Sequence, residues 1–145
     1  MNILGIDFGQ KRIGLAWMQV GLDVILPFGV VQNSPAEIVP KELVKLIEEE
    51  RINKVVIGLP LGMEGEENMN TKRVRAFREE LKKQINLPIE FIDERFTTHE
   101  ASRMEGTASV DEKSAMLILE SYIDTIRNEN SDFSTRSTKP KSESR

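Results

Sequence analysis

The sequence predicts an α/β fold in which a mixed five-stranded sheet carries helices on both faces. Three strand-like runs come first, joined by short links that contain Gly, Gln and Asp, and this spacing is typical of an antiparallel meander. Two further apolar runs then alternate with helical patterns, which requires parallel pairing through right-handed crossovers. At 145 residues, the chain is long enough for one domain with a substantial core.

The first half of the chain supplies the meander and one helix. Strands are expected at residues 2–8, 12–20 and 24–33, where apolar and β-branched residues dominate. A helix is expected next, because Ser34 and Glu37 have the spacing of a capping box, with proline at the first helical position. Apolar residues then recur at helical spacing at Leu43, Leu46 and Ile47.

The second half alternates strands and helices. Residues 54–60 form a continuous β-branched run, typical of a strand that is covered on both faces. A helix with an apolar stripe at Val74, Phe77 and Leu81 follows, and the next strand is expected at residues 87–94. These elements provide the two parallel strands of the sheet.

Two helices and a tail complete the predicted chain. Thr97 and Glu100 have capping-box spacing and predict a short helix. The last helix is expected from about Asp111 to Ile126. Residues 128–145 are polar and aperiodic, which predicts a disordered tail and a folded domain over 1–127. This order of elements is the layout of the ribonuclease-H-like fold.

Composition excludes several classes of protein. The chain has no cysteine and one histidine, His99, so a disulfide framework and a thiolate zinc site are excluded. No apolar run approaches the roughly 20 residues that span a bilayer, and the N-terminus lacks a signal-peptide pattern. We therefore expect a cytoplasmic protein that does not contact a membrane. The net charge of −4 argues mildly against a nucleic-acid partner, because phosphate binding normally requires a basic surface, but the distribution of the basic residues matters more than the sum.

Carboxylates are expected to gather at one edge of the sheet. Asp7 lies near the carboxyl end of the first strand, where ligands collect in open α/β sheets. Asp93 and Glu94 end the last strand, so one of them can project to the same edge. Asp111 precedes Ala115 by four residues and therefore lies on the inward stripe of the last helix.

Such a group of carboxylates predicts a site for Mg²⁺ or Mn²⁺, because these ions prefer carboxylate oxygens and would neutralise the mutual repulsion. Carboxylate-bound ions of this kind support hydrolysis of phosphodiesters. Structural alternatives remain open for each acid. Asp7 can accept N–H groups of the following turn, Asp111 can cap the last helix, and Asp93 can pair with Arg95.

Five motifs give a more specific identification. "IDFGQKRIGLA", "VIGLPLGMEG", "RVRAFREEL", "LPIEFIDERFTTHEA" and "DEKSAMLILESYID" occur in this order over residues 1–127. Together they resemble the YqgF/RuvX family, whose members are described as Holliday junction resolvases and as nucleases that mature the 5′ end of pre-16S rRNA. The resemblance implies a ribonuclease-H-like hydrolase that acts on ester bonds.

The resemblance also implies roles for individual residues. Asp7, Glu94 and Asp111 correspond to the acids expected to hold metal and to carry catalysis. Lys11 and Arg12 follow the first acid as in the family's opening motif and are expected to contact nucleic acid. Arg73 and Arg75 are expected at the start of a helix, where cations oppose the macrodipole, so at least one of them is expected to face the nucleic acid. Arg95 flanks the candidate site and is expected to orient Glu94 or to contact the phosphate. The sequence departs from the family at Gly62, where the usual "GLPLNMDG" loop has an amide side chain.

Three functions are compatible with these features. The favoured one is a metal-dependent nuclease in ribosome biogenesis that processes the 5′ end of pre-16S rRNA, with a pre-ribosomal particle as partner. The alternatives are a Holliday junction resolvase acting on branched DNA and a non-catalytic rRNA-binding factor. A resolvase is expected to be a symmetric dimer, but no apolar stripe in the sequence indicates a dimer face, so we expect a monomer or a weak homodimer.

Overall fold

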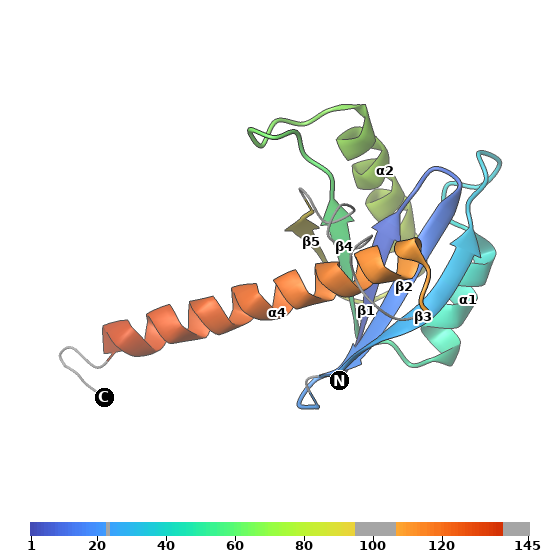
Figure 1. The fold of residues 1–145 in the computed structure, drawn as a ribbon. Helices are drawn as coiled ribbons and strands as arrows, with labels where there is room; N and C mark the ends of the chain where they lie inside the picture. Colours follow the sequence, from blue (N-terminus) through green and yellow to red (C-terminus); the bar gives the residue numbers. More distant parts are fainter. Residues whose placement is uncertain (23, 95–106, 138–145) are drawn as a thin grey trace.

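The computed structural model describes residues 1–22, 24–94 and 107–137, with side chains up to residue 128. It contains one mixed sheet with the strand order β3-β2-β1-β4-β5 (Figure 1). The strands are β1 (Asn2–Phe8), β2 (Arg12–Gln19), β3 (Ile25–Gln32), β4 (Lys54–Leu59) and β5 (Ile89–Asp93). The first three are antiparallel neighbours, and β4 is parallel to both β1 and β5. This arrangement confirms the predicted sheet, with β1 at its centre.

Helices cover both faces of the sheet, as predicted. They are α1 (Lys41–Glu49), α2 (Met69–Gln84) and α4 (Val110–Ser137). The helices α1 and α2 lie on one face and α4 crosses the other (Figure 1). Because successive strand residues point to opposite faces, each central strand contributes to two cores. The core under α1 and α2 includes Leu4, Ile6, Leu43, Ile57, Phe77 and Leu81. The core under α4 includes Ile3, Ala16, Val56, Ile118 and Leu119.

The helix α4 approaches the sheet closely because it crosses glycines. A Cβ atom on Gly5 would lie 2.6 Å from Cγ of Leu119. A Cβ atom on Gly14 would overlap the backbone of Asp111. Since real Cβ atoms do not tolerate such contacts, these glycines set the depth of the helix. The start of α4 is thereby held over the ends of β1 and β2.

The start of α1 differs from the prediction. The capping box expected at Ser34 and Glu37 does not form, and these two residues instead make an isolated antiparallel bridge. The helix begins at Lys41, with Pro40 in the N-cap position. Proline disfavours helical backbone in the residue before it, so Val39 stays outside the helix. The proline therefore overrides the local capping signal.

The last helix begins as predicted but continues beyond residue 127, as far as Ser137, and its end projects away from the sheet (Figure 1). No glycine or proline interrupts the sequence over 110–137, so neither of the strong helix-breaking residues ends it earlier. Residues 138–145 of the predicted tail, and the short helix expected at Thr97, lie outside the described residues. None of the helices in the described ranges combines the length and apolar character that a bilayer crossing requires.

Candidate active site

Strand register brings Asp7 and Glu94 to the same face of the sheet. Asp7 lies four residues after Ile3 in β1, so the two side chains are on the same face of the sheet, the one that α4 covers. Glu94 directly follows β5, and its backbone N–H donates to the carbonyl of Leu59 at 3.1 Å. The ladder thus continues past the last strand residue, and Glu94 falls on the same side as Ile92, which packs in the core under α4. The two acids, far apart in sequence, meet at the carboxyl ends of their strands.

The same register places Asp93 on the other face. Asp93 is paired with Leu59 and alternates with Ile92 and Glu94, so it falls on the side of Phe91, which packs in the core under α1 and α2. The sequence left open which of the two adjacent acids joins Asp7. The structure shows that it is Glu94.

The Asp7 and Glu94 carboxyl groups are hydrogen-bonded to each other and largely shielded from water. Burial, followed by the negative charge of Asp7, raises the pKa of Glu94 to about 9. Burial also raises the pKa of Asp7 to about 6, although the hydrogen bond from Glu94 opposes that rise. Near neutral pH, Glu94 therefore holds a proton and donates it to the Asp7 carboxylate. The partner of the Asp7 carboxylate is thus Glu94, and not the backbone N–H groups of the following turn, which the sequence offered as an alternative.

A glycine on the strand between the two acids makes their contact possible. Gly58 lies on β4, and a Cβ atom there would overlap the carboxylate of Glu94 and lie 2.5 Å from Cδ1 of Ile118. Sequence reasoning missed the importance of this residue. The available signal was a glycine interrupting a β-branched run, which often marks a close approach of another group.

Asp111 does not cap α4. Ser109 fills that position, because its Oγ accepts the Glu112 backbone N–H at 3.1 Å. The Glu112 carboxylate in turn accepts the Ser109 backbone N–H at 3.0 Å. This is a capping box, and its Ser-x-x-Glu pattern was visible in the sequence but was not recognised. The Asp111 carboxylate is therefore available to the site.

Asp111 lies beside the carboxyl pair and forms an ion pair with Arg12. The Arg12 Nε donates to Oδ2 of Asp111 at 2.8 Å. Asp7 is paired with Gly14, which touches the backbone of Asp111, and the charge of Asp111 contributes to the raised pKa of Asp7. Within the described part of the chain, no set of three acidic or histidine side chains is grouped closely enough to hold a metal ion. The structure thus brings two of the predicted acids into contact and places the third where its charge reaches Asp7.

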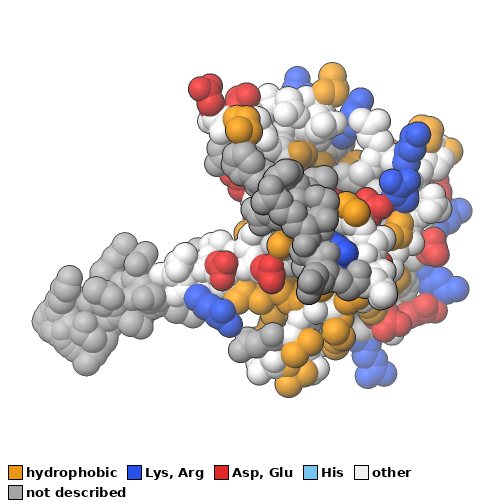
Figure 2. Space-filling view, in the orientation of Figure 1, with side chains coloured by type: hydrophobic (Ala, Val, Ile, Leu, Met, Phe, Trp, Pro, Cys, Tyr) orange, Lys and Arg blue, Asp and Glu red, His pale blue; other side chains and the backbone are white. Residues whose placement is uncertain are grey.

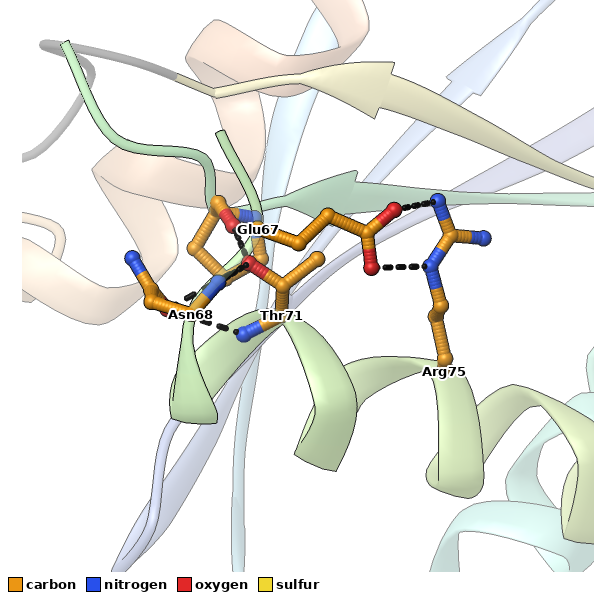
Figure 3. A network of polar contacts seen from close by, with 5 residues as sticks. Glu67, Asn68, Thr71 and Arg75 are labelled. Carbon is orange, nitrogen blue, oxygen red and sulfur yellow. Dashed lines mark hydrogen bonds and ion pairs between the residues drawn. The ribbon is translucent and has the colours of Figure 1, made fainter. Parts of the chain in front are cut away.

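Arg75 is engaged by a carboxylate of the same chain (Figure 3). Its Nε and Nη2 atoms donate to the two oxygens of Glu67 at 3.0 and 2.7 Å, and this bond lowers the pKa of Glu67. Its guanidinium also lies 5.5 Å from the ring centroid of Phe91. Asn68 and Thr71 form the capping box that begins α2. Arg75 therefore fastens the loop before α2 to the helix, a contact that the sequence did not predict.

Two other predicted cations are exposed near the same edge. Lys11 lies on the turn between β1 and β2. Arg73 lies in the second turn of α2, not at its start as expected, and its Nη1 donates to Asn70 at 3.0 Å. Acidic and basic side chains are interspersed on the face seen in Figure 2, so any contact with phosphate depends on individual cations. Arg95 lies outside the described residues.

At Gly62, where the family motif has an amide side chain, the structure places another group. The Gly62 N–H donates to the carbonyl of Glu66 at 2.8 Å, and a Cβ atom on Gly62 would overlap the Glu66 carboxylate. Glu66 thus folds back over the glycine and occupies that space. Contacts between Gly62 and Glu66, within the loop itself, therefore fill the space that the amide side chain would take.

Comparison with known proteins identifies the family of the chain. The family model described as "RuvX: Holliday junction resolvase" matches residues 1–125. A protein of Maridesulfovibrio salexigens is 33% identical over 132 residues, covering 85% of this chain and 98% of the relative. A protein of Dictyoglomus turgidum is 36% identical over 135 residues, covering 87% and 96%. Both relatives carry the name "Putative pre-16S rRNA nuclease".

Solved structures show the same fold at low sequence identity. RuvC of Thermus thermophilus superimposes with a TM-score of 0.55 and 14% identity, covering 86% of this chain and 96% of that one. The resolvase of fowlpox virus superimposes with a TM-score of 0.53 and 10% sequence identity, covering 87% of this chain and 99% of that one. These likenesses confirm the predicted ribonuclease-H-like fold. The family model and the relatives show that this chain belongs to the RuvX family.

Proposed function

We propose that this protein is a metal-dependent nuclease that hydrolyses a phosphodiester bond in processing the 5′ end of pre-16S rRNA. The observation that carries the proposal is the Asp7–Glu94 carboxyl pair at the carboxyl ends of β1 and β5. Two buried carboxyl groups in contact are unfavourable unless a proton or a cation lies between them. Such a pair at this edge of an α/β sheet is suited to bind a ligand.

The donor atoms fit Mg²⁺ or Mn²⁺, since all of them are carboxylate oxygens. A divalent cation would take the place of the proton that Glu94 holds, because metal ligands must be deprotonated. We assign Asp7 and Glu94 as ligands, and Asp111 as a third that must leave Arg12 and approach the pair, since the three side chains are not grouped closely enough in this structure. When bound, the ion would supply activation of water and stabilisation of the leaving oxygen.

The cations of the turn after β1 would position the substrate. The Arg12 guanidinium is exposed beyond its contact with Asp111, and its fork geometry suits a phosphate. Lys11, the preceding residue, is also exposed. We assign both residues to the phosphate backbone of the nucleic acid, where contacts fix position and not sequence. Arg95 is proposed for the same role on the basis of the family motif.

The choice of substrate rests on the relatives. Their name favours pre-16S rRNA, and we propose that the protein acts on it in the cytoplasm, with a pre-ribosomal particle as partner, as a monomer or a weak homodimer. The description of the matching family model favours a four-way DNA junction instead. A resolvase makes paired cuts and is expected to act as a symmetric dimer, so oligomeric state helps to separate the two.

The test is cleavage of a labelled 5′-extended pre-16S RNA fragment and of a four-way DNA junction by purified protein. Wild type and Asp7→Asn are compared in Mg²⁺, in Mn²⁺ and in EDTA, with Asp124→Asn as control because Asp124 is an exposed residue of α4. We expect metal-dependent cutting of the RNA that Asp7→Asn abolishes and Asp124→Asn retains. Cutting of the junction alone would assign the resolvase activity. Binding of the RNA without cutting by folded wild type would indicate a non-catalytic factor.

A further inference from the structure

A concave surface lies on the face of the sheet opposite to the carboxyl pair. It is a pocket of about 430 Å³ between the turn after β1, the segment after β3 and the helix α2. Its lining includes Phe8, Gln10, Lys11, Asn33, Ile38 and Arg73. Asp7 and Phe8 are neighbours in β1, and their side chains point to opposite faces. The pocket and the acids therefore lie back to back at one strand end.

The walls of the pocket combine cations with exposed apolar surface. Lys11 comes from the turn and Arg73 from α2. Ile38 is 55% exposed, so it leaves apolar surface facing the solvent-filled space. The Phe8 ring is fixed by Phe77, with ring centroids 4.4 Å apart. A flat apolar group flanked by negative charge would match this lining.

The turn that carries Lys11 is held in place. The Asn33 side chain donates to the Gly9 carbonyl at 2.7 Å, and its backbone N–H donates to the Lys11 carbonyl at 2.9 Å. Lys11 lines the pocket, while the next residue, Arg12, contacts Asp111 on the acid side. Lys11 and Arg12 are adjacent in the chain but lie on opposite sides of the sheet edge, so one strand of nucleic acid can contact both side chains.

We propose that this pocket receives an unpaired nucleotide of the substrate strand, close to the bond that is cut. The base would lie on Phe8 and Ile38, with its flanking phosphates near Lys11 and Arg73. The Glu37 carboxylate, which also lines the pocket, can accept amino or imino N–H groups of the base, as carboxylates do for cytosine. This inference rests on the proposed nuclease function and specifies its substrate.

The shape of the pocket decides between unpaired and paired nucleic acid. A volume of about 430 Å³ falls in the range of sites for small organic ligands. A base inside a duplex is stacked on both faces and paired on its edge, so it cannot enter, whereas an unpaired base offers its faces to apolar and aromatic side chains. The substrate is therefore expected to be single-stranded or locally open near the cut.

The test measures binding of a fluorescein-labelled single-stranded RNA and of the same strand annealed to its complement as a blunt duplex, in EDTA, by fluorescence anisotropy. Wild type is expected to prefer the single strand. Ala76→Phe fills the pocket from α2 without changing charge and is expected to weaken single-strand binding by about tenfold, the order of one lost base contact. Lys11→Ala is expected to reduce the dependence of log K on log salt by about 0.7 for the single strand. Lys45→Ala removes an exposed charge of α1 outside the pocket and serves as control.

Equal affinity for both RNAs, or an equal loss for both with Ala76→Phe, would overturn the pocket assignment. Cleavage of the pre-16S fragment by wild type in Mg²⁺ is measured in parallel. Cleavage without single-strand preference would retain the nuclease proposal and reject the pocket. Pocket-dependent binding of single strands without cleavage would retain the pocket and reject the nuclease.

Discussion

The Asp7 and Glu94 carboxyl groups are hydrogen-bonded to each other although their strands are not neighbours. Asp7 lies in β1 and Glu94 follows β5, with β4 between them. The contact passes over Gly58 of β4, where no side chain intervenes. The candidate site therefore depends on an absent side chain as much as on the acids.

Gly58→Ala is expected to disable the site. The added Cβ would overlap the Glu94 carboxylate and contact Ile118, and overpacking of this kind costs about 1–3 kcal/mol in free energy of unfolding. Urea denaturation and RNA cleavage measure the two effects. In the Gly58→Ala/Glu94→Ala double variant much of the clash is gone, so its loss of stability should be smaller than the sum of the two single losses. Simple additivity would contradict the proposed contact.

The carboxyl pair should make the protein less stable as pH rises. The folded pKa of Glu94 is about 9 against an ordinary 4.5, and that of Asp7 is about 6 against 3.8. Between these values the native state binds more protons than the unfolded chain, so its free energy of unfolding falls with increasing pH. In EDTA we expect the free energy of unfolding to decrease as the pH rises. Asp7 contributes to this decrease up to about pH 6, and Glu94 contributes up to about pH 9.

Glu94→Gln isolates the Glu94 part of that decline. The amide cannot ionise, so the variant should be more stable than wild type at mildly alkaline pH, by about 1–3 kcal/mol, and should be inactive. Urea denaturation across the pH range, with Glu120→Gln as a control on exposed Glu120 of α4, makes the comparison. A slope in Glu94→Gln as steep as in wild type would show that other groups cause the decline.

Divalent metal should stabilise the wild type by an amount that increases with pH. A ligand at about 100 times its Kd adds about 2.7 kcal/mol to the free energy of unfolding, and binding must displace the proton of Glu94. Thermal unfolding with Mn²⁺ and with EDTA should therefore differ more at alkaline than at acidic pH. Asp7→Asn should lose this difference and Asp124→Asn should retain it. An equal Mn²⁺ effect in Asp7→Asn would place the ion elsewhere.

Arg12→Ala is expected to lower activity far more than stability. The Arg12 side chain is 55% exposed, and exposed ion pairs contribute about 0–1 kcal/mol. Loss of a phosphate contact should reduce cleavage by about tenfold or more, since hydrogen bonds to charged groups are worth about 1.5–3 kcal/mol. Cleavage rates and urea midpoints of the variant and of Arg12→Lys provide the measurement. A large fall in the midpoint with normal cleavage would assign Arg12 a structural role.

The sheet and its order could be predicted because they follow from local patterns. The strands at residues 2–8 and 54–59 are β-branched or apolar runs bounded by turns, and the apolar stripe of α2 repeats at helical spacing. The start of α1 could not be read correctly, because the capping pattern at Ser34 and the proline at Pro40 give opposite signals and the proline prevails.

The pairing of side chains could be predicted only in part. The choice of Glu94 over Asp93 depends on which face of the sheet each residue faces, and the apolar pattern of β5 does not specify this because its apolar residues pack on both faces. The ion pair between Arg12 and Asp111 joins residues that lie far apart in the sequence, so spacing alone could not predict it. The role of Ser109 as the cap of α4 was legible in the sequence, but Asp111 offered a competing candidate two residues later.

The glycines beneath α4 have a consequence for how the protein tolerates mutation. At Gly14 and Gly58 any side chain would clash with Asp111 or Glu94. Substitutions there would therefore displace the acidic residues while leaving their carboxyl groups in the sequence. A saturation library selected for cleavage should find these two glycines as intolerant as Asp7 itself. If the same library is selected only for folded protein, variants at Glu94 should survive, whereas variants with bulky residues at Gly14 or Gly58 should be lost.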